Sequence, residues 1–372
     1  MKDQQKKLHE CSQQPQQLHI PFTNNLYYKY EGLSANEQIF LINGKKHPYK
    51  HHPFSLKDKG KKLARPRVQL TEEHARAMAF PMLDERSSDV TKVVFPNGRV
   101  NYVLFCRRHS ACTKMRKLHE CMEQRGMELD VFLSTLESKC LLKDELGGGW
   151  YIASGYGNMG RNVSPALRRP DQPALRKCLR HSEHHVLAKI VGTIFSYVAG
   201  CISAHCPKIY ETNQKLLKKH PKLAWPPLKY QGQGCKWMST QFAVRRWGPA
   251  HTEAERFPER ETVAAHTDRG DLDCFTCHIY RTGGGWRVAG TDIAVFEHSE
   301  GGPGYRVKTC VEDAVVLLLF QSHSQLHGCI KSADDYIEDS TAWSTRIIPY
   351  IPRGVYHWMT RNPNGDPFID IP

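Results

Sequence analysis

Three residues of metal-ligand type stand at spacings that constrain how this chain can fold. His266 and Asp268 are two residues apart, so on an extended strand both side chains point to the same face. His327 follows 59 residues after Asp268 (327 − 268), just beyond the apolar run 315–320 (VVLLLF). That run has the length and composition of a buried strand. For the third side chain to join the other two, this strand must return beside the first one.

The residue types predict an iron centre. Two imidazoles and one carboxylate on one face of an octahedral ion leave three positions open, which suits non-haem Fe(II) oxygen chemistry. We therefore expect His266, Asp268 and His327 to be both the metal ligands and the catalytic residues. The alternative interpretation of His-x-Asp is a surface turn, since the chain has 20 histidines.

Short strands surround these residues in an order typical of a jelly-roll barrel. Alternating or apolar sequence predicts strands at 238–247, 273–281, 292–298, 305–310, 315–320 and 341–351. A glycine-rich turn, Gly283-Gly284-Gly285, follows the second of them. The predicted fold class is α+β, with a double-stranded β-helix (jelly-roll, cupin-like) core that helices buttress. A basic, partly disordered N-terminal arm is expected to precede it.

Residues 237–351 resemble the catalytic core of the Fe(II)/2-oxoglutarate-dependent dioxygenases, and within that superfamily the TET/JBP branch. The matched features are the MSTQF strand before HTD, the glycine-rich turn, the apolar run ending in LHG, and an arginine on the next strand. The resemblance implies that the His-x-Asp…His set binds Fe(II). It also implies that Arg346, 19 residues past His327 (346 − 327), binds the far carboxylate of 2-oxoglutarate. Arg353 is the alternative for that role, but it lies outside the predicted strand.

The chain departs from the family pattern around the last strand. Pro349 and Pro352 lie near Arg346, and the serine that many relatives carry two residues after the arginine is absent. A relative in the same branch uses ascorbate and has an acidic residue five positions after its first histidine ligand. This chain has Asp271 at that position (271 − 266). Ascorbate therefore stays an alternative co-substrate, with Asp271 as a substrate-binding candidate.

The resemblance also implies a substrate, the methyl group of a modified base in nucleic acid. 5-Methylcytosine is the first expectation, with thymine and N6-methyladenine as alternatives, and the base must leave the duplex stack to reach the metal. Arg245, Arg246 and Trp247 precede a charged loop before HTD, and such residues hold phosphates and stack on bases. The alternative functions are a dioxygenase of a protein or small molecule, and a non-catalytic nucleic-acid-binding barrel.

Net charge is where the composition departs from that of an ordinary globular chain. The 372 residues include 52 lysines and arginines against 38 acidic residues, a net charge of +14. Such a surplus favours nucleic acid, DNA above all, because basic side chains neutralise phosphates. No apolar stretch follows Met1, which predicts neither a signal peptide nor a membrane partner, and the 13 cysteines are typical of free thiols. We expect a monomer in the nucleus, or otherwise in the cytoplasm.

Composition divides the chain into four predicted parts. Residues 1–70 are expected to be a polar and basic arm, largely disordered. Residues 71–170 are expected to form an α+β region that packs on the core. Residues 171–361 hold a long helix, predicted at 173–204, and the dioxygenase core. Residues 362–372 are expected to form a tail.

Three segments remain open to more than one interpretation. Five residues of metal-ligand type lie close together without paired CxxC spacing, so buried thiols compete with a zinc site; they are Cys106, His109, Cys112, His119 and Cys121. Cys274-x-x-Cys277-His278 offers the same two interpretations. The glycine-dense segment 146–161 lacks a phosphate-binding motif and is expected to be a mobile loop near the barrel.

Overall fold

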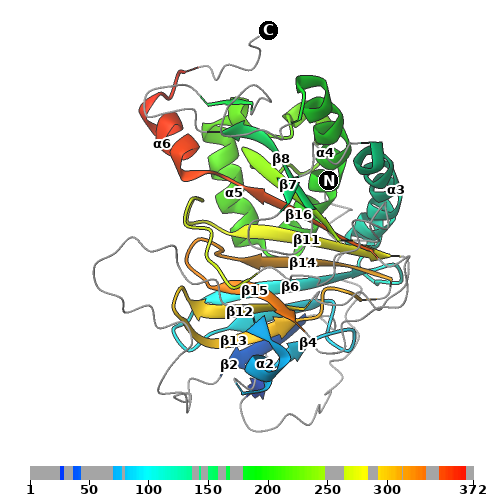
Figure 1. Ribbon diagram of the computed structural model, residues 1–372, viewed down its shortest axis with the longest axis vertical. Helices are drawn as coiled ribbons and strands as arrows, with labels where there is room; N and C mark the ends of the chain where they lie inside the picture. The colour runs from blue at the N-terminus through cyan, green and yellow to red at the C-terminus, as the bar shows by residue number, and fades with distance from the viewer. Residues whose placement is uncertain are drawn as a thin grey trace, which may run out of the picture.

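The computed structural model describes residues 26–28, 37–42, 70–77, 80–135, 142–143, 150–157, 165–167, 179–247, 264–283, 292–311, 313–331 and 343–365. In these residues two β-sheets pack together, and long helices cover the outer face of the larger sheet (Figure 1). One buried cluster fills the space between the sheets, and another lies between the larger sheet and the helices.

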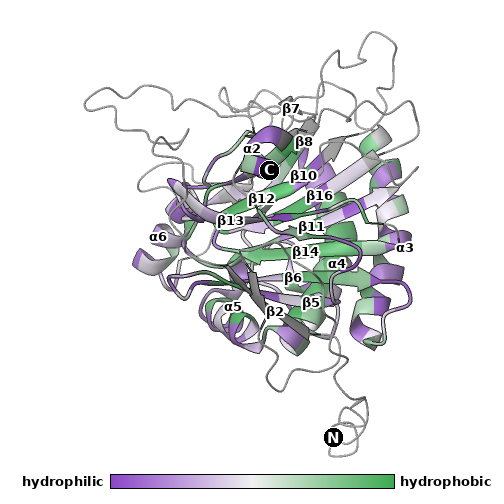
Figure 2. Cartoon of the chain, turned by 90° about the horizontal axis from the view of Figure 1, so that it is seen from below, coloured by the Kyte–Doolittle hydropathy of each residue, from purple (hydrophilic) through white to green (hydrophobic). Residues whose placement is uncertain are grey.

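Four antiparallel strands form the centre of the larger sheet, in the order β14-β11-β16-β10. They are β10 (Gln241–Trp247), β11 (Thr276–Gly283), β14 (Ala314–Phe320) and β16 (Trp343–Tyr350). Every residue of β14 is buried, because one face meets the helices and the other meets the smaller sheet. This explains the unbroken apolar sequence of the strand, which Figure 2 shows in the hydrophobic colour.

The smaller sheet has the order β3-β15-β12-β13-β4. Its strands are β3 (Leu70–Thr71), β4 (Met82–Leu83), β12 (Ile293–His298), β13 (Gly301–Val307) and β15 (His327–Lys331). The segment around His266 joins the same sheet through an isolated antiparallel bridge to His327. In the sequence this segment lies between β10 and β11, which both belong to the larger sheet.

The order in which the chain visits the two sheets identifies the barrel. From β10 onward it runs larger, smaller (the His266 segment), larger (β11), smaller (β12 and β13), larger (β14), smaller (β15) and larger (β16). Four of these eight segments lie in each sheet, and eight segments that alternate in this way form a double-stranded β-helix. The predicted fold class is therefore confirmed.

Further strands widen the larger sheet on both sides of the barrel. Beyond β14 lie β6 (Val100–Arg107), β5 (Val90–Val94), β2 (Glu37–Ile42) and β1 (Leu26–Tyr28). Beyond β10 lie β8 (Trp150–Gly157) and β7 (Leu142–Lys143), and β9 (Ala166–Leu167) pairs with β8. Strands β1 and β2 fall within 1–70, and the rest of that predicted arm before Leu70 lies outside the described residues.

The prediction of a mobile loop at 146–161 is wrong for its central part, which is strand β8. Gly155 has a φ of +120°, and a Cβ atom there would lie 2.5 Å from the carbonyl oxygen of Thr240. Glycine here serves a close approach of two backbones, which local composition does not distinguish from loop flexibility.

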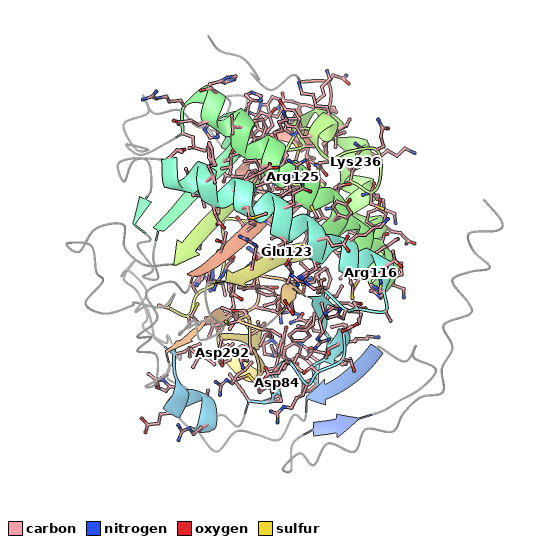
Figure 3. The ribbon with its side chains drawn as sticks, turned by 90° about the vertical axis from the view of Figure 1, so that its right-hand side faces the viewer. Asp84, Arg116, Glu123, Arg125, Lys236 and Asp292 are labelled. Atoms are coloured by element: carbon pink, nitrogen blue, oxygen red, sulfur yellow. The ribbon has the colours of Figure 1, made fainter. Side chains whose placement is uncertain are left out.

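Three helices cover the larger sheet: α3 (Thr113–Thr135), α4 (His181–His205) and α5 (Pro207–Lys219). Figure 3 looks onto this side, with Arg116, Glu123 and Arg125 along α3. Helix α4 is long and apolar enough to cross a membrane, yet 61% of its apolar window is buried inside the fold, as in the core helix of a globular protein. The predicted helix at 173–204 corresponds to α4, although 173–178 lie outside the described residues.

The remaining helical pieces are short. They are α2 (Glu72–Ala77), the 3-10 turns Pro221–Leu223 and Leu228–Tyr230, and α6 (Arg353–Arg361). Helix α6 follows β16 directly and buries Val355, Trp358 and Met359. The strand predicted at 305–310 begins earlier, at Gly301, where positive φ angles at Gly301 and Gly302 turn the chain back from β12.

Candidate metal centre

The backbone brings two of the three predicted ligands side by side. The N–H of His266 donates to the carbonyl oxygen of His327, the N–H of His327 donates to the carbonyl oxygen of His266, and both distances are 2.9 Å. Directly paired residues of an antiparallel ladder place their side chains on the same face. Gly328 permits this approach, because a Cβ atom there would lie 2.8 Å from the Cα and N atoms of Ala265.

Asp268 completes a triangle of ligand atoms. Nε2 of His266 lies 3.4 Å from one carboxylate oxygen of Asp268, and Nε2 of His327 lies 3.5 Å from the other. One ligand atom from each residue lies within 4.8 Å of the other two. An octahedral ion with bonds of about 2.1 Å places neighbouring ligand atoms about 3 Å apart. The three side chains therefore have the chemistry and the spacing to hold a divalent cation.

Hydrogen bonds behind the imidazoles aim both rings at the same point. Nδ1 of His266 lies 2.8 Å from the carbonyl oxygen of Ala264, and Nδ1 of His327 lies 3.1 Å from that of Gln325. A ring whose Nδ1–H donates to a carbonyl carries its lone pair on Nε2. In both histidines the Nε2 atom is the one that faces Asp268. The tautomers that these contacts select are the ones that bind a metal.

Charge states at neutral pH also suit a cation. Burial alone would raise the pKa of Asp268, but the neighbouring rings of His266 and His327 lower it well below its usual range. Burial, together with the neighbouring His266, lowers the pKa of His327 from 6.5 to about 3. The carboxyl is therefore ionised and the His327 ring neutral, so no proton on either must be displaced by the metal.

Exposure shows how the triangle is oriented. The side chain of His327 retains 5% of its exposure, that of His266 17% and that of Asp268 28%. His327 thus lies at the closed end and Asp268 nearer solvent. The backbone of the Asp268 loop is held by its N–H, which donates to the carbonyl oxygen of Ser322 at 2.9 Å.

His278 on β11 lies beside the triangle, although the sequence offered it only as part of a zinc alternative. Its ring centroid lies 5.7 Å from that of His327, and its Nδ1 atom lies 3.3 Å from the hydroxyl of Tyr280. Burial lowers its pKa well below 6.5, so the ring is neutral. Among the described residues its Nε2 atom has no hydrogen-bond partner. The place of the His278 imidazole inside the barrel was not recognisable from sequence, because it depends on which strands flank β11.

Arg346 lies inside the barrel, on β16. Its guanidinium carbon lies 4.7 Å from the centre of the Tyr280 ring, and its Nη2 atom donates to Sγ of Cys329 at 3.4 Å. Arg245 on β10 is its direct cross-strand partner, so the two arginines share a face. The charge of each lowers the pKa of Tyr280, although burial outweighs both and the net shift is upward.

The other predicted binding residues are placed unevenly. Arg246 and Trp247 lie on β10, but their side chains and residues 248–263 lie outside what the structure describes. Asp271 stays beside the metal triangle, since its N–H donates to the carbonyl oxygen of Asp268 at 2.9 Å. Burial and the charge of Asp268 raise the pKa of Asp271 to about 8. Arg353 begins α6 and is exposed, with Nη2 3.1 Å from Nδ1 of His323.

The triangle is the only group of three or more metal-ligand side chains that gathers within the described part of the chain. The zinc alternative for 106–121 is thus wrong as a single cluster. His119 and Cys121 are buried on α3, and His109 is exposed beyond β6. In the second segment, Cys277 faces the helices whereas His278 faces the barrel, because neighbours on a strand point to opposite faces.

Comparison with known proteins adds distant likenesses. No protein-family model and no curated protein matches the chain. It is similar to the structure of a bsmA homologue from Methylobium petroleophilum PM1, at 15% identity over 63% of this chain and 86% of that one, with a TM-score of 0.25. It is also similar to the Fe(II)/(alpha)ketoglutarate-dependent dioxygenase TqaL, at 11% identity over 66% and 91%, with a TM-score of 0.26. At these TM-scores neither likeness supports a conclusion about this chain. The fold is identified by the strand order, and the candidate site by the geometry of the triangle.

Proposed function

We propose that this chain is an Fe(II)- and 2-oxoglutarate-dependent dioxygenase that oxidises the methyl group of a modified base in nucleic acid. One observation carries the enzyme class: two Nε2 atoms and a carboxylate converge from the smaller sheet of a double-stranded β-helix. Iron(II) held there by His266, Asp268 and His327 would supply activation of dioxygen for hydroxylation of a C–H bond.

The arginine pair supports 2-oxoglutarate as the co-substrate. Arg346 and Arg245 lie on paired positions that face the barrel interior. A dicarboxylate uses one carboxylate at the metal and extends the other towards a guanidinium, which holds it with two hydrogen bonds. Ascorbate is the second candidate, and the observation that favours it is the place of Asp271 beside the metal triangle.

Nucleic acid, DNA first, is the proposed partner because of charge. The surplus of 14 positive charges favours phosphate contacts. A base must leave the stack before its methyl carbon reaches the open side of the triangle, and 5-methylcytosine is the first candidate, before thymine and N6-methyladenine. A nuclear monomer fits this role. A dioxygenase of a protein or small molecule is the alternative.

The decisive experiment is mass spectrometry of nucleosides from methylated DNA. The DNA is incubated with the protein, Fe(II) and 2-oxoglutarate, and a parallel reaction receives ascorbate in place of 2-oxoglutarate. We expect hydroxymethylated or formylated base with 2-oxoglutarate only. If product forms with ascorbate alone, ascorbate is the co-substrate, and Asp271 replaces Arg346 as the residue assigned to bind it. Succinate without base product keeps the enzyme class and rejects the nucleic-acid substrate; neither succinate nor product rejects the class.

Replacing Arg346 tests the co-substrate separately from the metal. Arg346→Lys keeps the charge but loses the second hydrogen bond, so we expect the KM for 2-oxoglutarate to rise about tenfold or more. Fe(II) affinity, measured by titration, should change less than about twofold, since Arg346 is not a ligand. Arg353→Lys is the matched control, because Arg353 is exposed and contacts His323 instead. An unchanged KM in Arg346→Lys contradicts the assignment.

A further inference from the structure

A second group of reactive side chains lies on the helix side of the larger sheet. Cys112 immediately precedes α3, and its Sγ atom lies 3.3 Å from Nε2 of His205, the last residue of α4. Behind this pair, Cys106 on β6 is hydrogen-bonded to Cys201, one helical turn before His205. Cys106 and Cys201 are buried in the core beneath the helices, whereas Cys112 is half-buried and accessible.

The surroundings of Cys112 favour its thiolate. Burial alone would raise the pKa of Cys112, but the hydrogen bond to His205 and those from the backbone of Met115 and Lys114 lower it below 9. The two backbone donors belong to the first turn of α3, where N–H groups lack intrahelical partners. Thiolate, and not thiol, is the nucleophile.

Other cysteines have surroundings of the opposite kind. Burial raises the pKa of Cys274 and of Cys121 to about 12, and it raises the pKa of Cys106 well above 9. Cys274 is the useful comparison, because it is also partly exposed, yet burial and the charges of Asp271 and Asp273 raise its pKa.

We propose that Cys112, paired with His205, is a modification site that reacts with small disulfides such as oxidised glutathione. The Cys112 thiolate attacks one sulfur of the disulfide, and a new S–S bond forms as the old one breaks. The released glutathione thiolate takes a proton from water. Cys112 is oxidised to a mixed disulfide and one glutathione is reduced, so atoms and electrons balance.

The groups that set the pH dependence of this reaction come from every element around Cys112. His205 faces it from α4, and Cys106, which itself lies against Cys201, faces it from β6. Asp89 acts through Ser110: the Ser110 hydroxyl donates to Asp89 at 3.0 Å and accepts the Cys112 N–H at 3.0 Å. Lys114 turns its ammonium towards the Ser203 hydroxyl, at 3.5 Å.

The test is the rate of alkylation of each cysteine by iodoacetamide between pH 5.5 and 9, measured on peptides by mass spectrometry. We expect Cys112 to be labelled at pH 7 while Cys274 is not. His205→Gln should slow Cys112 labelling at pH 7 about tenfold and move the midpoint of its pH profile up by about one unit. His205→Lys places a cation at this position and should restore most of the rate, which a merely structural role would not.

Two controls keep this result specific. Lys114→Gln should change the rate less than about twofold, because Lys114 acts through its backbone N–H and not through its charge. Thermal unfolding of each variant establishes that it is folded. Equal labelling of Cys112 and Cys274, or an unchanged Cys112 profile in folded His205→Gln, overturns the proposal.

A second measurement uses oxidised glutathione itself. At pH 7 the wild-type protein should gain the mass of one glutathionyl group, located on the peptide containing Cys112, and reductant should remove it. Cys112→Ser should gain none. If Zn²⁺ at micromolar concentration instead protects Cys112 and Cys106 together from labelling, the cluster is a metal site and the proposal is overturned.

Discussion

At the scale of single residues, the metal triangle depends on a glycine that carries no ligand. In Gly328→Ala the new Cβ atom would meet the backbone of Ala265 at 2.8 Å, so the bridge between His266 and His327 must open. We expect the affinity for Fe(II) to fall about tenfold or more, as when the groups that orient metal ligands are lost. Gly270→Ala is the control, since nothing lies within 4 Å of that Cβ position. Titration of the metal-free proteins checks both, and equal affinities contradict the expectation.

A buried neutral imidazole gives a second prediction at this scale. The folded-state pKa of His278 lies well below 6.5, so the unfolded chain binds its proton first as pH falls. His278 therefore lowers the free energy of unfolding progressively as the pH falls below about 6.5. In His278→Phe we expect a smaller fall in Tm between pH 7 and pH 5 than in the metal-free wild type. His298→Gln, at a 52% exposed side chain, is the control and should follow the wild type.

At the scale of elements, two glycines predict opposite effects of the same substitution. Gly155→Ala places a Cβ atom 2.5 Å from Thr240 and at a positive φ, so strand β8 must move away from β10. We expect it to lower the free energy of unfolding by about 1–3 kcal/mol. Gly200→Ala, in α4 with nothing within 4 Å, should raise it by up to about 1 kcal/mol. Urea denaturation measures both, and equal signs contradict the account of β8.

At the scale of the whole molecule, the charge surplus predicts how binding responds to salt. A net charge of +14 with a nucleic-acid partner implies that counterions leave the phosphates on binding. We expect the Kd for a methylated duplex, measured by fluorescence anisotropy, to rise at least about tenfold between 50 and 200 mM KCl. If the Kd stays constant over that range, the basic residues do not contribute to binding, and a protein or small-molecule substrate is favoured.

Local pattern was enough to predict much of the barrel. A buried strand reveals itself by an unbroken apolar run such as 315–320, and a His-x-Asp pair on extended chain fixes two side chains on one face. Asn97-Gly98 is a strong hairpin signal, and this pair stands at the turn between β5 and β6. The β8 segment was not readable, because Gly155 marks a close backbone contact with residues far along the chain.

What the sequence determined by itself is the set of residue types and the face that each strand residue shares with its neighbours two positions away. Only the tertiary structure decided which strands lie side by side. That choice brings His278 to the metal triangle, sets Arg245 opposite Arg346, and joins Cys112 to His205. The physical reason is that strand periodicity specifies a face, whereas the partner across it is selected by packing between segments distant in the chain.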